Sequence, residues 1–272
     1  MNTIRANEQK AAAAFTGQAP VFDDLYNADT IINYKRCRVR RHILKHLAPG
    51  CSILELNCGT GEDATWFAGI GFKVHATDIS AGMLYQLVQK LERLKMKTKV
   101  SFELCSYTNL AELKTKGPYD LIFSNFAGLN CTGELDKVLG SFSPLLKPNG
   151  IVTLVVLPKF CLWETLLLFK GKFRTAFRRF FSGYGRKARV EGAYFKCWYY
   201  NPSYIIKKLH DDFELIGIEG LCTIVPPSYI EGFAEKHPSA FKFLRRWENK
   251  LKAKWPWRYI GDYYIISMRK KM

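Results

Sequence analysis

Between Cys51 and Leu157 the sequence alternates regularly between short apolar runs and stretches with a helical pattern. The apolar runs are CSILELN, FKVHATD, KVSFELCS, YDLIFSN and GIVTLVVLP, and each has the length of one buried strand. Helical patterns separate several of them, over Glu62–Ile70, Ala81–Lys95 and Thr132–Leu146. Strands that alternate with helices in this way predict an α/β fold in which a mostly parallel sheet is covered by helices on both faces.

The glycine-rich stretch LELNCGTGEDA connects the first predicted strand to the first predicted helix. Glycines there let the backbone adopt positive φ and approach a ligand closely. Gly59, Gly61 and Ala64 fit the dinucleotide pattern G-x-G-x-x-G/A, and Asp78 ends the next strand, where that pattern has an acid. Glu55 precedes the glycines, where a carboxylate can face an amine or a sulfonium but would repel a pyrophosphate. The loop therefore favours S-adenosylmethionine over a nicotinamide dinucleotide.

Four motifs in order make the stretch from Ser52 to Pro158 resemble class I S-adenosylmethionine-dependent methyltransferases. They are ELNCGTG, HATDIS, YDLIFSNFAGLN and LKPNGIVTLVVL. The resemblance implies a Rossmann-like, seven-stranded, mostly parallel sheet with an antiparallel last strand and helical lid insertions. It also implies S-adenosyl-L-methionine as the cofactor and Asp78 as the acid that holds its ribose hydroxyls.

The chain departs from the motifs of this family at two positions. The first glycine is replaced by Asn57, which tolerates the left-handed backbone region better than most residues. The acid often found after the third strand is replaced by Ser106, so the adenine would rest on a hydroxyl and on apolar walls such as Ile79 and Met83. The predicted cofactor-binding residues are Glu55, Asn57, Cys58, Gly59, Gly61, Asp78, Ile79, Met83, Ser106, Tyr107 and Asn125.

We expect one methyltransferase domain over residues 1–272, with a lid built from its N-terminus and two insertions. Within the N-terminal part, Asp29–Leu47 has the pattern of an amphipathic helix, and Lys35, Arg36 and Arg38 lie among the basic residues outside its apolar side. The expected parts are an N-terminal helical cap (1–48), a cofactor-binding core (49–158), a basic aromatic insertion (159–201) and C-terminal strands (202–272) around a second helical insertion (228–254).

The charge of the chain is strongly unbalanced. Lysine and arginine number 41 against 24 aspartate and glutamate residues, which gives a formal net charge of +17. Such an excess points to an anionic partner, namely nucleic acid, a membrane surface or an acidic substrate or carrier. No apolar run reaches the length of a membrane span, and the N-terminus lacks the apolar core of a secretory signal. We therefore expect a cytoplasmic protein with possible peripheral contact to an anionic membrane.

The cysteines do not follow the spacing of a metal module. Eight are present, no two of them form a C-x-x-C pair, and no histidine lies at zinc-finger spacing from a cysteine pair. We predict no metal site.

The acceptor must be inferred from the insertion after the fifth strand. Phe173, Ala176, Phe177, Phe180 and Phe181 fall at the spacing of one helix face, and Lys172, Arg174, Arg178 and Arg179 take other positions. This pattern favours an interfacial helix on an anionic surface, and a lid helix packed on the core is the alternative. Members of the family with a similar insertion methylate quinone-like, polyketide or lipid-linked acceptors, which implies a small or medium lipophilic acceptor. Phe15, Phe22 and Tyr26 could close the same pocket.

The sequence does not identify a catalytic base. The five histidines are scattered, and Glu164 and Tyr199 are candidates because they lie in the insertion. Methyl transfer requires mainly alignment of the acceptor with the methyl group and exclusion of water.

Three alternative functions remain open. The charge and the interleaved aromatic residues suit a nucleic-acid methyltransferase, although SNFAG stands where amine-methylating members carry Asn/Asp-Pro-Pro-aromatic. The others are a non-catalytic adaptor at membrane surfaces and a NAD-linked oxidoreductase.

Overall fold

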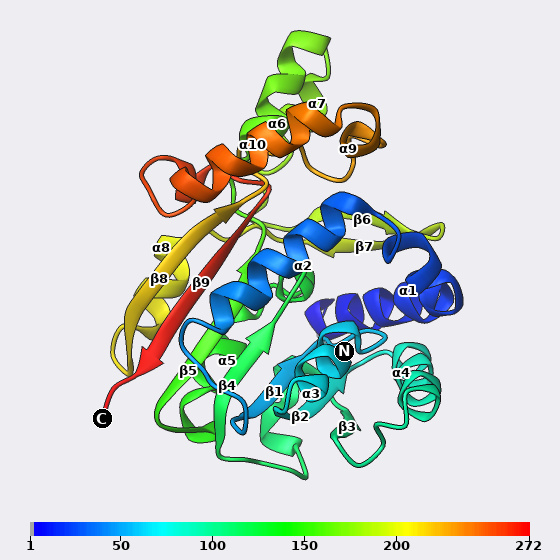
Figure 1. The fold of residues 1–272 in the computed structure, drawn as a ribbon, viewed down its shortest axis with the longest axis vertical. Coiled ribbons are helices and arrows are strands. Elements are labelled where there is room, and N and C mark those ends of the chain that lie inside the picture. The colour runs from blue at the N-terminus through cyan, green and yellow to red at the C-terminus, as the bar shows by residue number, and fades with distance from the viewer. Residues whose placement is uncertain (1–2) are drawn as a thin grey trace.

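A seven-stranded sheet with strand order β3-β2-β1-β4-β5-β9-β8 forms the centre of the molecule (Figure 1). The computed structural model describes residues 3–272. β1 to β5 pair in parallel, and the last strand, β9, is antiparallel to both of its neighbours. This confirms the predicted Rossmann-like sheet. The strands are β1 (Ser52–Leu56), β2 (Lys73–Asp78), β3 (Val100–Leu104), β4 (Tyr119–Ser124), β5 (Leu146–Val156), β8 (Phe213–Leu221) and β9 (Tyr263–Lys270).

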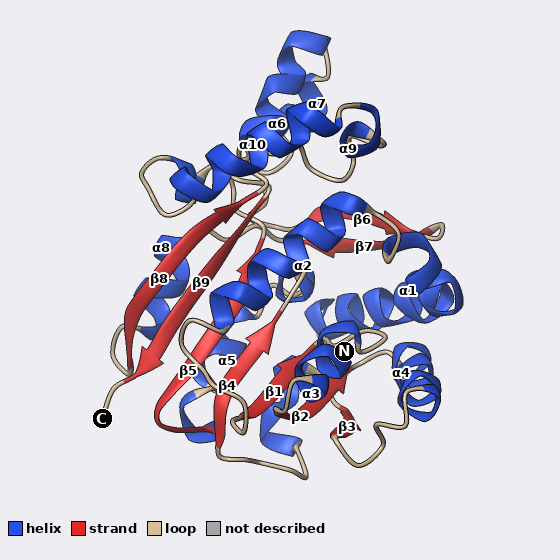
Figure 2. Cartoon of the chain, in the orientation of Figure 1, coloured by secondary structure: helices blue, strands red, loops and turns tan. Residues whose placement is uncertain are grey.

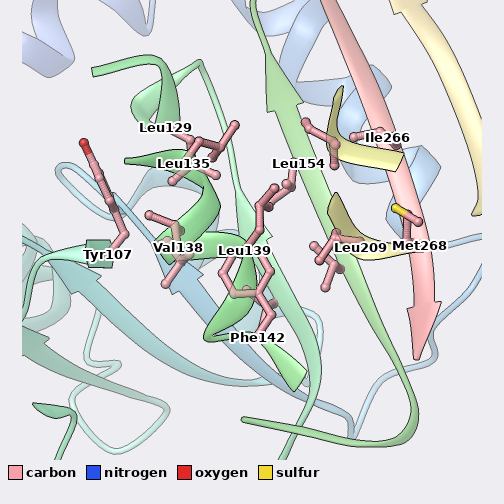
Figure 3. Packing of buried hydrophobic residues seen from close by; sticks show 14 of the residues in the cluster. Tyr107, Leu129, Leu135, Val138, Leu139, Phe142, Leu154, Leu209, Ile266 and Met268 are labelled. Atoms are coloured by element: carbon pink, nitrogen blue, oxygen red, sulfur yellow. The ribbon is translucent and has the colours of Figure 1, made fainter. Parts of the chain in front are cut away.

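Helices cover both faces of the sheet because its central strands are apolar on both sides. In β4, Leu121 and Phe123 pack on one face and Ile122 on the other. The first face is covered by α2, α3 and α4, and the second by α5, α8 and the short helix η1. Figure 3 shows how α5, β5 and β9 interlock on the second face. These helices are α2 (Thr30–Ile43), α3 (Glu62–Gly69), α4 (Ala81–Arg93), η1 (Tyr107–Glu112), α5 (Leu135–Gly140) and α8 (Pro202–Leu209).

The helix predicted over Thr132–Leu146 is shorter than expected. α5 ends at Gly140, the 3₁₀ helix η3 (Ser143–Leu145) follows, and β5 already begins at Leu146. Pro144 lies at the start of η3. It cannot donate the hydrogen bond that a continuing helix needs, and it disfavours the helical region for the residue before it.

The N-terminal part forms two helices, α1 (Thr3–Tyr26) and α2. Asp29 caps α2 by accepting a hydrogen bond from the Ile32 amide at 2.7 Å. The basic residues Lys35, Arg36 and Arg38 are buried, although the sequence placed them outside the apolar side of this helix. α2 therefore carries cations into the core, because it lies between the sheet and the C-terminal helices (Figure 1).

The prediction that residues 173–181 form one helix with an aromatic face is wrong. The helical segments here are α6 (Leu162–Leu166), η4 (Leu167–Lys170) and α7 (Phe173–Ala176), and α7 ends before the arginine pair. Arg179 is buried and binds Glu164 at 2.6 Å and Asp262 at 2.7 Å. These two ion pairs hold Arg179 in the interior of the molecule. A helix with Arg179 on its solvent side therefore does not form. Turns and a two-stranded hairpin, β6 (Arg186–Val190) and β7 (Ala193–Cys197), follow (Figure 2).

The second insertion forms α9 (Phe233–Lys236) and α10 (Pro238–Leu251), and a short 3₁₀ helix, η5 (Trp257–Tyr259), follows it. Glu248 anchors α10 to the rest of the molecule. Its carboxylate is fully buried and accepts hydrogen bonds from Arg38, from the Tyr34 hydroxyl and from the backbone amides of residues 222–225. A basic, exposed helix is thus held by one buried acid.

None of the helices within residues 3–272 combines the length and the apolar character that crossing a membrane requires.

Candidate active site

A cavity of about 140 Å³ lies at the carboxyl ends of β1, β2 and β4, under α1. Ligands of α/β proteins bind at this edge of the sheet, because the strand order reverses between β1 and β4. Every predicted cofactor-binding residue lines the cavity except Gly61 and Ser106. The lining members are Glu55, Asn57, Cys58, Gly59, Asp78, Ile79, Met83, Tyr107 and Asn125.

The loop between β1 and α3 has the backbone geometry that its sequence predicts. Asn57, Gly59 and Gly61 all have positive φ, at 46°, 57° and 74°. The Asn57 side chain is held on both ends, since its oxygen accepts from the Ser124 hydroxyl and its nitrogen donates to the Asn125 carbonyl. A Cβ on Gly61 would lie 2.1 Å from Leu87 of α4, whereas one on Gly59 would meet nothing within 4 Å. Gly61 therefore allows helix packing, and Gly59 leaves space for a ligand.

Asp78 ends β2 with its carboxylate fixed by backbone amides. One oxygen accepts from the Gly59 amide at 2.9 Å and the other from the Ser80 amide at 2.8 Å. Burial raises the pKa of this carboxyl, and the amide hydrogen bonds offset only part of that effect. The carboxylate is thereby oriented in the cavity wall beside the glycine loop, where it can accept hydrogen bonds from ligand hydroxyls.

Glu55 is buried in the cavity wall, and its Oε2 atom has no hydrogen-bond partner among the described residues. Burial raises the pKa of this carboxyl well above its usual value, and the nearby Asp63 raises it further, despite the opposing influence of Arg36 and Arg40. A buried oxygen without a donor costs free energy unless a ligand supplies one. The site thus fits a ligand that brings a cationic N–H group to Glu55.

Arg36 is a cavity residue that the sequence interpretation missed. Its guanidinium binds Asp63 at 3.3 Å and lies 4.9 Å from the centre of the Phe126 ring, and its Nε has no partner among the described residues. Asn125 donates to the same Asp63 oxygen at 2.8 Å. Among the described lining residues Arg36 is the one lysine or arginine, so it can hold an anionic group of a ligand. Its place in a basic helical pattern gave no signal that it would turn inward.

Glu8 is a second missed residue, and it comes from α1. Its carboxylate is buried and accepts hydrogen bonds from the hydroxyls of Ser106, Thr108 and Thr132 at 3.2, 2.8 and 2.7 Å. Ser106 itself lies outside the cavity lining and holds Glu8, which lines it. The Glu8 carboxylate from α1 therefore lies beside Ser106. Ser106 is the position at which methyltransferases with these motifs often have an acid after the third strand.

α1 is fastened over the cavity along its whole length. Thr16 shares a hydrogen bond with Ser80, the N-cap of α4, and Asp23 accepts from Thr60 and pairs with Lys90. Phe15 and Phe22 line the cavity as predicted, whereas Tyr26 does not. The helix thus covers one side of the cavity.

Glu164 and Tyr199, the candidate bases from the insertion, both lie outside the cavity lining. Burial acts to raise the pKa of Glu164, but hydrogen bonds from Arg178 and Arg179 outweigh it and hold that pKa below its ordinary value. Burial raises the pKa of the Tyr199 hydroxyl. Glu164 also lies close to Cys161 and Asp262, and the Arg179 guanidinium joins the two carboxylates of this cluster. Among the described residues, no histidine lines the cavity.

Comparisons with known proteins agree with this fold. Residues 53–150 match the family model described as a methyltransferase domain. No curated protein sequence matches the chain.

Solved structures with the same fold include three enzymes named for small-molecule acceptors. The 1,6-didemethyltoxoflavin-N1-methyltransferase of Burkholderia thailandensis, with bound S-adenosylhomocysteine, has 14% identity and a TM-score of 0.58 over 100% of this chain and 92% of its own. The geranyl diphosphate C-methyltransferase of Streptomyces coelicolor A3(2) has 13% identity and a TM-score of 0.54 over 87% and 79%. The magnesium protoporphyrin IX methyltransferase of Synechocystis PCC 6803 has 17% identity and a TM-score of 0.51 over 88% and 82%.

These findings confirm the predicted resemblance and fold, and the S-adenosylhomocysteine bound in all three neighbours agrees with the predicted cofactor. The cofactor role of each individual residue stays a prediction.

Proposed function

We propose, from the methyltransferase-domain core over residues 53–150, that this chain transfers a methyl group from S-adenosylmethionine to a small or medium lipophilic acceptor. The observation that carries the proposal is the buried carboxylate of Glu55, whose Oε2 has no hydrogen-bond donor among residues 3–272 and which lines the same cavity as Asp78. Such a pair suits a ligand with both a cation and hydroxyl groups. A nucleotide with a pyrophosphate would meet two acids instead.

We assign the ends of the cofactor to four side chains. Glu55 would pair with the amine of the methionine part, and Arg36 with its carboxylate. Asp78 would accept from the ribose hydroxyls, and Glu8 would face the exocyclic amine of the adenine. The bound cofactor supplies an activated methyl group, so the protein has to bind, orient and exclude water.

The acceptor side of the proposal rests on the apolar part of the cavity wall. Ala11, Ala12, Phe15 and Phe22 of α1 and Phe126 after β4 line it. We infer that alignment of the acceptor with the methyl group is the main source of rate, because the methyl group of the cofactor is already activated. The acceptors named for the solved neighbours, a heterocycle, a prenyl diphosphate and a porphyrin, support a small molecule without selecting one. Peripheral contact with an anionic membrane or an acidic carrier would bring such an acceptor to the enzyme.

The first test measures binding of S-adenosylhomocysteine by calorimetry. Asp78→Ala should weaken the affinity at least about tenfold, because charge-assisted hydrogen bonds contribute roughly 1.5–3 kcal/mol each. Asp120→Ala is the matched control, since Asp120 binds Ser52 and Lys147 away from the cavity lining. Equal affinity of Asp78→Ala and the wild type would refute the ribose assignment.

The second test is a methylation screen with labelled cofactor across phenols, quinols, fatty acids and RNA. We expect label in one of the lipophilic classes. Label in RNA alone would favour the nucleic-acid methyltransferase, and binding of cofactor without any transfer would favour the non-catalytic adaptor.

A further inference from the structure

We propose that the helices beyond the carboxyl end of the sheet dock the protein on the surface of an anionic lipid bilayer. The outer surface is defined here as the exposed side chains of α6, η4, α7 and the turn to Phe181, together with those of α10. Figure 1 shows these helices stacked past the ends of β8 and β9. Docking on the bilayer does not depend on the proposed function. Only the role of docking, which is to supply a lipophilic acceptor from the bilayer, rests on that function.

Large aromatic side chains of the outer surface point into solvent. Phe169, Phe173 and Phe181 are 90%, 63% and 68% exposed. On α10, Phe243 and Trp247 are 60% and 43% exposed. Aromatic residues in such number at one end of a water-soluble fold mark an interaction site, because they gain free energy on leaving water.

An apolar groove joins the two insertions. It lies between α6 and α10 and has a volume of about 410 Å³. Its walls consist almost entirely of leucine and aromatic side chains. They are Leu162, Trp163, Leu166, Phe243, Leu244, Trp247, Leu251 and Trp257, with Thr223 and Ile224 at the base. A groove of this composition suits an acyl chain.

The exposed charge of the outer surface has one sign. Between Lys159 and Lys187 the single acidic residue is Glu164, and between Lys236 and Lys254 it is Glu248. Both are buried and paired with arginines, Glu164 with Arg178 and Arg179, and Glu248 with Arg38. The exposed residues of these segments are therefore basic where they are charged, and they include Lys170, Lys172, Arg174, Lys242, Arg246 and Lys250.

This combination selects a bilayer among the possible occupants. A second copy of the chain would place basic surfaces against each other, which like charges oppose. A nucleic acid would satisfy the cations and stack on the rings, but it offers nothing to a groove walled by leucines. Anionic lipids offer both, with phosphate groups for the cations and acyl chains for the rings and the groove.

The outer surface is firmly tied to the catalytic fold. Arg179 joins α6 to Asp262 at the start of β9, and Glu248 joins α10 to α2 through Arg38. Docking would therefore bring the carboxyl end of the sheet, where the cavity lies, to the membrane surface.

The experiment is sedimentation of the full chain with vesicles of phosphatidylcholine, with and without phosphatidylglycerol. The wild type should bind only the anionic vesicles. Two triple variants each remove one contribution. The ring variant combines Phe169→Ser, Phe173→Ser and Phe181→Ser. The charge variant combines Lys170→Glu, Lys172→Glu and Arg174→Glu. Each should lower the partition coefficient at least about tenfold.

The controls apply the same changes at the amino-terminal edge of the sheet and on β3. Phe102→Ser with Leu104→Ser removes exposed apolar side chains, and Arg93→Glu with Lys99→Glu and Lys116→Glu reverses exposed charges. The apolar control should bind vesicles as the wild type does. The charge control should show at most a small decrease in the partition coefficient, because it lowers the net charge. Every variant should bind S-adenosylhomocysteine with wild-type affinity, which separates failure of docking from misfolding and from failure of the proposed methyl transfer.

Three outcomes would overturn the proposal. The first is a wild type that stays free of anionic vesicles. The second is a ring variant that binds as strongly as the wild type. The third is a charge variant that binds as strongly as the wild type. If vesicle binding is absent and the same substitutions weaken binding to single-stranded RNA, a nucleic acid is the occupant instead.

Discussion

At the scale of single residues, Glu55 links the chemistry of the site to pH. Burial raises the pKa of its carboxyl in the folded, unliganded protein, so this group favours folding at low pH and loses that contribution as the pH rises through the raised pKa. A cationic ligand pairs with the ionised form. Affinity for S-adenosylhomocysteine, which carries an amine, should therefore increase with pH over the same window.

Glu55→Gln keeps the shape of the side chain and removes its titration. We expect weaker binding and a flatter pH dependence in calorimetric titrations from acidic to neutral pH, with the remaining slope supplied by Asp78. A variant whose affinity follows pH as steeply as the wild type would show that another group titrates.

Removing the charge of two buried cations of α2 should change the free energy of unfolding by very different amounts. Arg38 pairs with Glu219 and Glu248, so Arg38→Met leaves two buried carboxylates without it and should lower the free energy of unfolding by about 3–5 kcal/mol. Lys35 has no carboxylate partner among the described residues and contacts the Ser228 hydroxyl and the rings of Phe126 and Tyr263.

Lys35→Met should therefore change the free energy of unfolding by less than about 1 kcal/mol, since it removes a desolvated charge along with those contacts. Urea titrations of both variants provide the comparison. Equal losses would mean that Lys35 has a counter-ion that these contacts do not include.

The residue-scale predictions succeeded where a motif fixes both the backbone and the side chain. The positive φ of Asn57 and the position of Asp78 beside the glycine loop followed from one local pattern. Arg36 and Glu8 could not be found in this way, because each reaches the cavity from a helix that joins the site only through tertiary packing. A basic or acidic residue in an amphipathic helix carries no local signal that it will be buried.

At the scale of elements, α1 covers the cavity, and Glu8 is one of the residues that attach it. Glu8→Ala leaves the hydroxyls of Ser106, Thr108 and Thr132 without that acceptor and should cost about 2 kcal/mol or more of local stability. Hydrogen exchange of the α1 amides should then accelerate relative to those of the sheet.

Gln9→Ala is the matched control, because Gln9 is the exposed neighbour on the same helix. It should leave α1 protection unchanged. Equal protection in wild type and Glu8→Ala would mean that the other fastenings, such as Asp23 with Lys90, hold the helix without Glu8.

Most elements of the core were predictable because strand and helix periods alternate there, although α5 is shorter than predicted. The helical second insertion was also predictable, since α10 lies within the predicted range 228–254. The first insertion was not, because its fold depends on ion pairs between residues far apart in the sequence. The helical spacing of 173–181 is present in the sequence, yet Arg179 is buried and paired with Glu164 and Asp262, and α7 ends before it. The hairpin β6–β7 packs against α1 and has no strong period of its own.

At the scale of the whole molecule, the net charge of +17 is distributed unevenly. Many cations of α2 neutralise buried acids, while those of α7 and α10 stay exposed around apolar side chains. Composition alone predicted an anionic partner, but the sorting of charges into paired and exposed sets is a property of the fold.

The central claim is that the cavity under α1 binds a positively charged methyl donor rather than a nucleotide with a pyrophosphate. The most direct measurement is a pair of calorimetric titrations of the wild-type chain, with S-adenosylhomocysteine and with NAD. We expect saturable binding of S-adenosylhomocysteine that Glu55→Gln weakens, and no binding of NAD. Binding of NAD, or no heat from S-adenosylhomocysteine under conditions where the chain is folded, would contradict it.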